Sequence, residues 1–236
     1  MLAQNRTGNY RFLAAEGRPF SGGAVADDGF DIVRARFERP LPLEAGLAAV
    51  SRHVAAAGRP VEAIAGFELR IPKPMTNAAF DLFNKAYVAH LRRLGLEVDG
   101  LMPAGRTNVA AVVGGVSEPS VYAVSYTTPG HRARPAFVLS GAAEEQSGDN
   151  ATMLDSIMRV LSVRLDELGV SWDQATAIQL YGVDDVQDLV VDTVLKKAGG
   201  AAIHGIQWFP SLPPVEGLKL EIDARSAGTE LVLPVA

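Results

Sequence analysis

Apolar and polar positions along this chain follow two periods. Alternation of apolar and polar residues, as in residues 33–37, is typical of a strand, whereas apolar residues recurring every three or four positions, as in residues 152–168, indicate an amphipathic helix. The pattern predicts strands over residues 30–37, 64–71, 108–113, 121–126, 136–140, 177–181, 203–209 and 217–225, and helices over residues 43–57, 76–94, 152–168 and 184–197. In the first strand we expect Arg34 and Arg36 to point outward. Strands that alternate with helices in this way predict an α+β fold, with mixed sheets covered by helices on one face.

The order of elements runs through the chain twice. The first pass starts at Ser21-Gly22 and the second at Ser140-Gly141, and an amphipathic helix and an apolar strand follow each. Residues 127–135 lie between the passes and carry two prolines and a glycine without any periodic pattern. We therefore expect two domains, residues 1–128 and residues 135–236. Because ligands of duplicated units bind at the seams between them, we look for the functional site there.

Composition excludes several classes of protein. The 236 residues carry a formal net charge of −5 and no recurring basic block, which argues against nucleic-acid binding. No apolar run is long enough to span a membrane, and the first residues lack the apolar core of a signal peptide, so we expect a cytoplasmic protein. There is no cysteine, which excludes disulfides and thiol chemistry, and the four histidines have no metal-ligand spacing.

Three charged side chains stand out as candidates for chemistry. Arg106 precedes a predicted strand, and its planar guanidinium can hold a carboxylate in a bidentate manner. Glu221 and Asp223 are two residues apart on the last predicted strand and share one face, where one carboxylate can raise the pKa of the other and prepare it as a general acid or base. A surface ion pair for Arg106 and a solvated strand face for the two acids are the alternatives. Glu144 and Glu145 are expected to begin a charged loop.

Several short segments, in this order and spacing, resemble the RidA/YjgF superfamily. The matching pieces are Phe20-Ser21-Gly22, Phe83-Asn84-Lys85-Ala86-Tyr87, Gly105-Arg106-Thr107-Asn108-Val109, Leu139-Ser140-Gly141, Gln179-Leu180-Tyr181, Leu212-Pro213-Pro214 and Leu218-Lys219-Leu220-Glu221-Ile222-Asp223. The resemblance covers nearly the whole chain and implies two tandem, chorismate-mutase-like β-β-α-β-α-β-β units. It also implies a homo-oligomer, because single-domain members assemble as trimers.

The resemblance also implies roles for these residues. In the superfamily an arginine at the position of Arg106 holds the substrate carboxylate, and a glutamate on the last strand helps to activate water. Here the first half has only the arginine, whereas the second half has Glu221 and Asp223, with His204 where its arginine would stand. The simplest reconciliation is one composite catalytic site in which Arg106 of one half faces Glu221 or Asp223 of the other. The alternative is that one or both sites are inactive.

Further residues are candidates for substrate binding. Ser21, Gly22, Ser140 and Gly141 end strands, where a glycine lets a ligand approach the backbone N–H groups, although turn geometry explains them equally well. Thr107 and Asn108 follow Arg106 and can present polar groups to the same pocket. His204 is a weaker candidate, because a structural histidine is the more common case.

We therefore expect a deaminase that hydrolyses the enamine or imine of a small anionic substrate to a keto acid and ammonia. The resemblance is to the branch of 2-aminomuconate deaminases of aromatic degradation. No cofactor and no metal are expected, because an imine carbon is already electrophilic. The alternatives are a chorismatase-like lyase or hydrolase acting on a cyclic carboxylate, and a non-catalytic metabolite-binding or scaffold protein.

Overall fold

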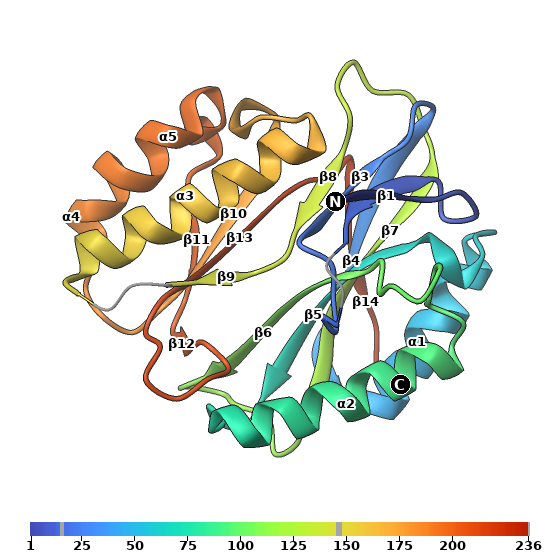
Figure 1. Cartoon of the computed structure of the whole chain (residues 1–236), viewed down its shortest axis with the longest axis horizontal. Coiled ribbons are helices and arrows are strands. Elements are labelled where there is room, and N and C mark those ends of the chain that lie inside the picture. Colours follow the sequence, from blue (N-terminus) through green and yellow to red (C-terminus); the bar gives the residue numbers. More distant parts are fainter. Residues whose placement is uncertain (15–16, 145–147, 236) are drawn as a thin grey trace.

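A computed structural model describes the chain except residues 15–16, 145–147 and 236. Two mixed β-sheets lie face to face, and helices cover the outer face of each (Figure 1). This arrangement is the α+β fold expected from the periodicity. Each helix buries its apolar stripe against one sheet, so the two sheets keep their other faces for each other.

The six-stranded sheet contains most of the first half of the chain. Its strands follow the order β12-β6-β5-β7-β4-β14. Their bounds are Ser211–Leu212, Gly105–Ala111, Ile64–Ile71, Ser120–Pro129, Phe30–Pro42 and Thr229–Leu233. Helices α1 (Leu43–Ala56) and α2 (Asn77–Arg93) cover its outer face. The Thr76 hydroxyl accepts a hydrogen bond from the Ala79 N–H and so caps α2, as the sequence indicated.

The eight-stranded sheet contains most of the second half. Its strands follow the order β1-β2-β3-β8-β13-β10-β11, with β9 paired to β13. Their bounds are Leu2–Asn5, Tyr10–Leu13, Gly23–Ala26, Phe137–Leu139, Glu221–Ser226, Ala177–Tyr181, Gln207–Phe209 and Ala142–Ala143. Helix α3 (Asn150–Leu168) and the helical segment from α4 (Gln187–Leu189) to α5 (Lys196–Ala198) cover its outer face.

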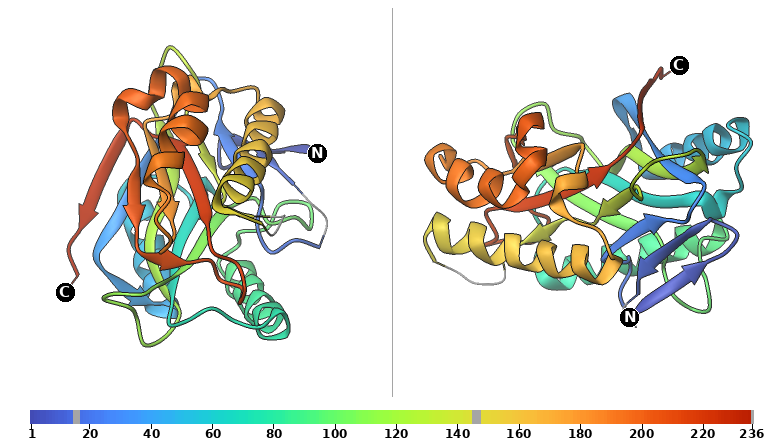
Figure 2. Two further views of the ribbon diagram at one scale, coloured as in Figure 1. Left: turned by 90° about the vertical axis from the view of Figure 1, so that its left-hand side faces the viewer. Right: turned by 90° about the horizontal axis from the view of Figure 1, so that it is seen from above.

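Strands cross between the two halves of the chain. Strands β1, β2 and β3 come from the beginning of the sequence, yet β3 pairs with β8 of the second half. In the other direction, β12 pairs with β6 and β14 lies parallel to β4. Figure 2 shows β14 leaving the body of the second half to reach the edge of the other sheet. The two halves are therefore interlocked, and the domain bounds 1–128 and 135–236 stay a prediction.

The sequence misjudged some elements. The strand expected over residues 203–209 is wrong at its start, because Gly199–His204 forms a 3₁₀ turn and only Gln207–Phe209 is extended. The last expected strand begins at Glu221 rather than at residue 217. The helix expected over residues 184–197 begins later, and Val190–Leu195 inside it is π-helical. The strands β1, β2, β3, β9, β12 and β14 were not predicted.

The inner faces of the two sheets are polar. The expectation that Arg34 points outward to solvent is wrong, because its side chain enters the space between the sheets and only 3% of the residue is exposed. Its Nε and Nη2 donate to Glu68 over 2.5 and 2.8 Å, and Glu230 of β14 accepts from its Nη1. Sequence alternation alone could not distinguish solvent from a second sheet, because both favour polar side chains on that face.

Candidate functional site

The first residues of strand β6 lie at the seam where the two halves of the chain meet. The Arg106 N–H donates to the Ser140 hydroxyl over 2.9 Å, and that hydroxyl donates to the Ser21 carbonyl over 2.6 Å. The Gly141 N–H donates to the Arg106 carbonyl. Segments from both passes of the repeat thus complete the free edge of β6. The seam expected from the duplicated sequence is present within one chain.

The four Ser-Gly residues have their amides already engaged. The N–H groups of Ser21, Gly22, Ser140 and Gly141 donate to the carbonyls of Ala104, Leu13, Gly22 and Arg106. These bonds fix the seam, so the structure gives the four residues a positioning role. Contact between a ligand and these four N–H groups, which the sequence suggested, has no free donor to support it.

Arg106 lies on the face of β6 that is turned toward α2. Its Cζ atom lies 4.4 Å from the ring centroid of Phe20 and 4.9 Å from that of Tyr87. Phe80 and Phe83 complete an aromatic cage at 5.4 and 5.6 Å. Nη2 donates to Asn84 Oδ1 over 2.8 Å, but Nη1 is buried without a hydrogen-bond partner. Burial lowers the pKa of Arg106 to about 10, because carboxylates are too few around it to offset the loss of water.

Other polar atoms near this guanidinium are also buried without partners. Asn108 lies two residues further along β6 and so on the same face, and neither its Oδ1 nor its Nδ2 has a hydrogen bond. The Tyr87 hydroxyl, whose ring contacts Arg106, has none either. Buried polar groups are normally paired, so a cluster of unpaired ones around a guanidinium indicates a place for a polar ligand. An anion with oxygen acceptors fits this set.

Glu221, the first residue of β13, lies beside this cluster. The Asn108 N–H donates to its carboxyl group, and Arg106 attracts it electrostatically. Burial, and then the neighbouring Asp223 carboxylate, raise the pKa of Glu221 to about 8. A Cβ atom on Gly141 would overlap the Glu221 carboxyl, so only glycine leaves room there. A carboxyl group that exchanges its proton near neutral pH suits general acid–base chemistry.

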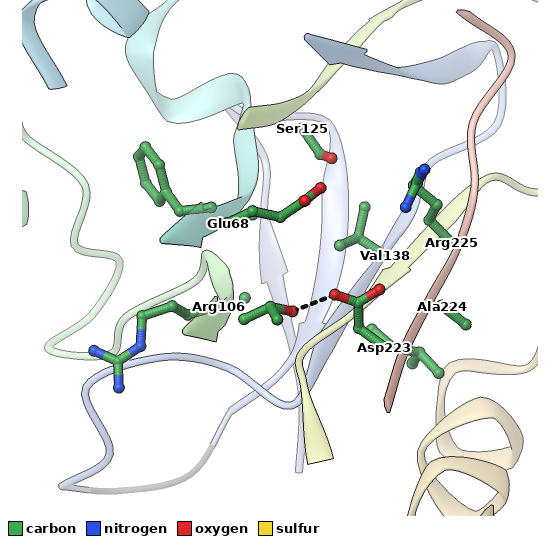
Figure 3. A pocket seen from close by; sticks show the side chains of 12 residues that line it. Glu68, Arg106, Ser125, Val138, Asp223, Ala224 and Arg225 are labelled. Atoms are coloured by element: carbon green, nitrogen blue, oxygen red, sulfur yellow. Dashed lines mark hydrogen bonds between the residues drawn. The ribbon is translucent and has the colours of Figure 1, made fainter. Parts of the chain in front are cut away.

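Asp223 lies on the inner face, and its acceptors are already used. Its carboxylate accepts hydrogen bonds from Thr107 Oγ1 over 2.6 Å, from the Tyr181 hydroxyl over 3.1 Å and from Gln179 Nε2. Burial, and then Glu68, raise the pKa of Asp223 to about 6. Figure 3 shows the Arg106 side chain pointing away from Asp223.

The inner face has little room for a substrate. The space lined by Glu68, Thr107 and Asp223 measures about 10 Å³, which is about the size of one water molecule. Glu221 therefore fits the role of acid and base at the Arg106 cluster better than Asp223, although the sequence ranked them together. Thr107 binds Asp223 instead of sharing the Arg106 pocket, because consecutive strand residues point to opposite faces.

Two further residues differ from expectation. His204 is exposed at the end of the 3₁₀ turn and lines a separate surface depression of about 390 Å³ with Arg132 and Arg134. Glu144 follows β9 in a loop, but its carboxylate is buried and accepts hydrogen bonds from the N–H groups of Lys219 and Leu220. It thereby fixes the chain just before Glu221. Glu145 lies outside the described residues.

The part of the chain that the structure describes holds no group of three or more His, Asp or Glu side chains arranged to bind a metal ion. None of the helices described here combines the length and apolar character needed to cross a bilayer.

Comparisons with known proteins show which sequences and structures this chain is similar to. The sequence model of a family described as 2-aminomuconate deaminase CnbZ matches residues 2–159 and 151–231. The chain is 37% identical over 246 residues to a 2-amino-5-chloromuconate deaminase of Comamonas testosteroni, covering 96% of each chain. A YjgF-family structure from Mycobacterium tuberculosis aligns at 22% identity with a TM-score of 0.32, covering 41% of this chain and 81% of its own. A yeast structure aligns at 16% identity with a TM-score of 0.31, covering 41% and 82%.

Proposed function

The chain belongs to the CnbZ family of 2-aminomuconate deaminases, which are tandem RidA-type enzymes, and we propose that its substrate is a conjugated amino-carboxylate of the 2-aminomuconate type. The reaction is hydrolysis of a dienamine through its imine tautomer. One water is consumed, and a keto acid and ammonia leave. The observation that carries this assignment is the set of unpaired polar atoms on Arg106 and Asn108, close to Glu221, whose carboxyl group accepts a hydrogen bond from the Asn108 N–H.

Arg106 holds the carboxylate next to the amine-bearing carbon. Its free Nη1 donates to one carboxylate oxygen, and the Asn108 amide can donate to the other. The aromatic cage excludes water, which strengthens the ion pair formed on binding. The planar rings of Phe20 and Tyr87 also suit the flat, conjugated chain of such a substrate.

Glu221 moves the protons. In its protonated form it donates a proton to the chain carbon of the dienamine, which turns the C–N bond into an electrophilic iminium. The resulting carboxylate then removes a proton from water as the water oxygen bonds to the iminium carbon. The carbinolamine nitrogen takes up the proton from Glu221, the C–N bond breaks, and the hydroxyl proton returns to Glu221. The net change is water consumed and ammonia released.

Ammonia release tests this function. Wild-type protein should release ammonia from 2-aminomuconate and from freshly generated 2-imino acids, and Arg106→Met should abolish release while circular dichroism shows a retained fold. Arg39→Met, which removes an exposed arginine far from β6, is the matched control and should retain full activity. Activity of Arg106→Met equal to wild type would contradict the assignment. Release of ammonia from none of the substrates by folded wild-type protein would do the same.

The assembly and location of the protein belong to the same proposal. A trimer of two-domain chains is what the superfamily resemblance implies, whereas the cytoplasmic location and the absence of a cofactor stay predictions from the sequence and from the chemistry of the imine. Light scattering coupled to size-exclusion chromatography measures the mass of the assembly directly. A mass of three chains of 25.0 kDa is the expected result.

A further inference from the structure

A surface depression adjoins the aromatic cage around Arg106. It has a volume of about 400 Å³, and its lining includes Asn84, Lys85 and Pro19. Asn84 Oδ1 accepts the hydrogen bond from Arg106 Nη2, so Asn84 forms a wall shared by the depression and the aromatic cage. Pro19 directly precedes Phe20, whose ring lies 4.4 Å from Arg106 Cζ. Since the guanidinium itself is buried, the depression is the natural approach for a ligand that reaches it.

The lining of the depression offers one uncommitted positive charge. Lys85 follows Asn84 on α2, is exposed, and forms no ion pair with any described residue. Arg92 lines the same depression, but its guanidinium is paired with Glu97. Asp81 lies one helical turn before Lys85 without bonding to it, while Val88 and Pro19 supply apolar wall between the charged groups.

We propose that Lys85 binds the distal carboxylate of a conjugated dicarboxylate whose proximal carboxylate is held by Arg106. This inference rests on the proposed function and assigns the residue that would bind the second carboxylate of such a substrate. The chain of the ligand would pass Asn84 and lie along Pro19 and Val88. The two cations, Arg106 and Lys85, would then bind the carboxylates at its two ends. A monocarboxylate of the same skeleton would gain only the Arg106 contact and would bind more weakly.

Two unreactive dienes that differ in one carboxylate test the inference without turnover. Muconate has a carboxylate at each end, whereas sorbate has the same conjugated chain with only one. By calorimetry wild-type protein should bind muconate five- to tenfold more tightly than sorbate, which corresponds to about one exposed ion pair. Lys85→Met should remove this preference, Lys85→Arg should keep it, and sorbate affinity should stay the same in all three proteins.

Arg93→Met is the matched control, because Arg93 is an exposed cation on the same helix that does not line the depression. It should keep the preference for muconate. A preference retained in Lys85→Met, or reduced equally in Arg93→Met, would overturn the role of Lys85. Neither result would touch the proposed function, whose failure would appear as ammonia release that does not depend on Arg106. If wild-type protein binds muconate no better than sorbate, the inference also falls.

Discussion

Arg34 and Arg106 are equally buried, each 3% exposed, but lie in opposite surroundings. Arg34, between the sheets, donates to two carboxylates; burial alone would lower its pKa, yet Glu68 raises it above the ordinary value. Arg106, on the outer side of β6, faces aromatic rings and one amide, and burial lowers its pKa. The Arg34 guanidinium has its carboxylate partners within the fold. The Arg106 guanidinium lacks one, and a bound anion would supply it, because a buried cation without a carboxylate costs stability.

The largest expected difference between the two arginines is in stability. Arg34→Met leaves Glu68 buried without its partner and should lower the free energy of unfolding by about 3–5 kcal/mol. Arg106→Met removes an unpaired charge from an aromatic cage and should leave that free energy unchanged or raise it. Urea denaturation of both variants measures this. A large loss in Arg106→Met would show that Arg106 is a structural residue as well.

Gly141→Ala tests how strongly activity depends on the position of the Glu221 carboxyl group beside Arg106. The added Cβ overlaps the Glu221 carboxyl and should displace it, which we expect to lower kcat about a hundredfold, the effect of a misplaced catalytic group. Steady-state kinetics of Gly141→Ala, Glu221→Gln and the double variant separate the cause. If Gly141 acts through Glu221, the double variant should be no slower than Glu221→Gln alone. Additive losses would show another role for Gly141.

Asp223→Asn should change the pH dependence of activity more than its maximum. Burial accounts for most of the raised pKa of Glu221, and the charge of Asp223 accounts for a further part. Without that charge the pKa of Glu221 falls from about 8, so the alkaline limb of kcat/KM should move to lower pH. The measurement is a pH–rate profile of both proteins. An unchanged limb together with a hundredfold loss of kcat would instead place Asp223 in the chemistry.

A further expected effect is on stability as pH changes. The folded protein holds the Glu221 proton up to about pH 8, whereas the unfolded chain loses it near pH 4.5. The stabilisation linked to this proton is therefore complete below pH 4.5 and is lost as the pH rises to about 8. Glu221→Gln should flatten that decline in thermal melts. Glu68, whose pKa Arg34 lowers to about 2 against the effect of burial, acts in the opposite direction and loses its contribution only in acid.

The sequence predicted the class of fold, and it drew attention to residues of the candidate site, for identifiable reasons. Periodicity located the long helices and central strands, and the recurring Ser-Gly pairs led to the seam where Arg106, Asn108 and Glu221 meet. What it could not predict depends on long-range pairing. The exchange of β1–β3, β12 and β14 between the sheets leaves no local signal in the sequence. The burial of Arg34 and Glu144 leaves none either, since a charged residue that faces water and one that faces a buried partner give the same sequence pattern. The aromatic cage also draws residues from separate segments.

The exchange of strands also sets the order in which this protein can mature during synthesis. The six-stranded sheet needs β12 and β14, and Glu230 of β14 pairs with Arg34 and Arg225. When the ribosome has produced β4 to β7, their sheet still has bare edges and an uncompensated set of inward-facing charges. More than a hundred further residues must then be synthesised after Arg106 before Glu221 is present. A chain released early therefore carries only half of the candidate site and a sheet with unpaired edges.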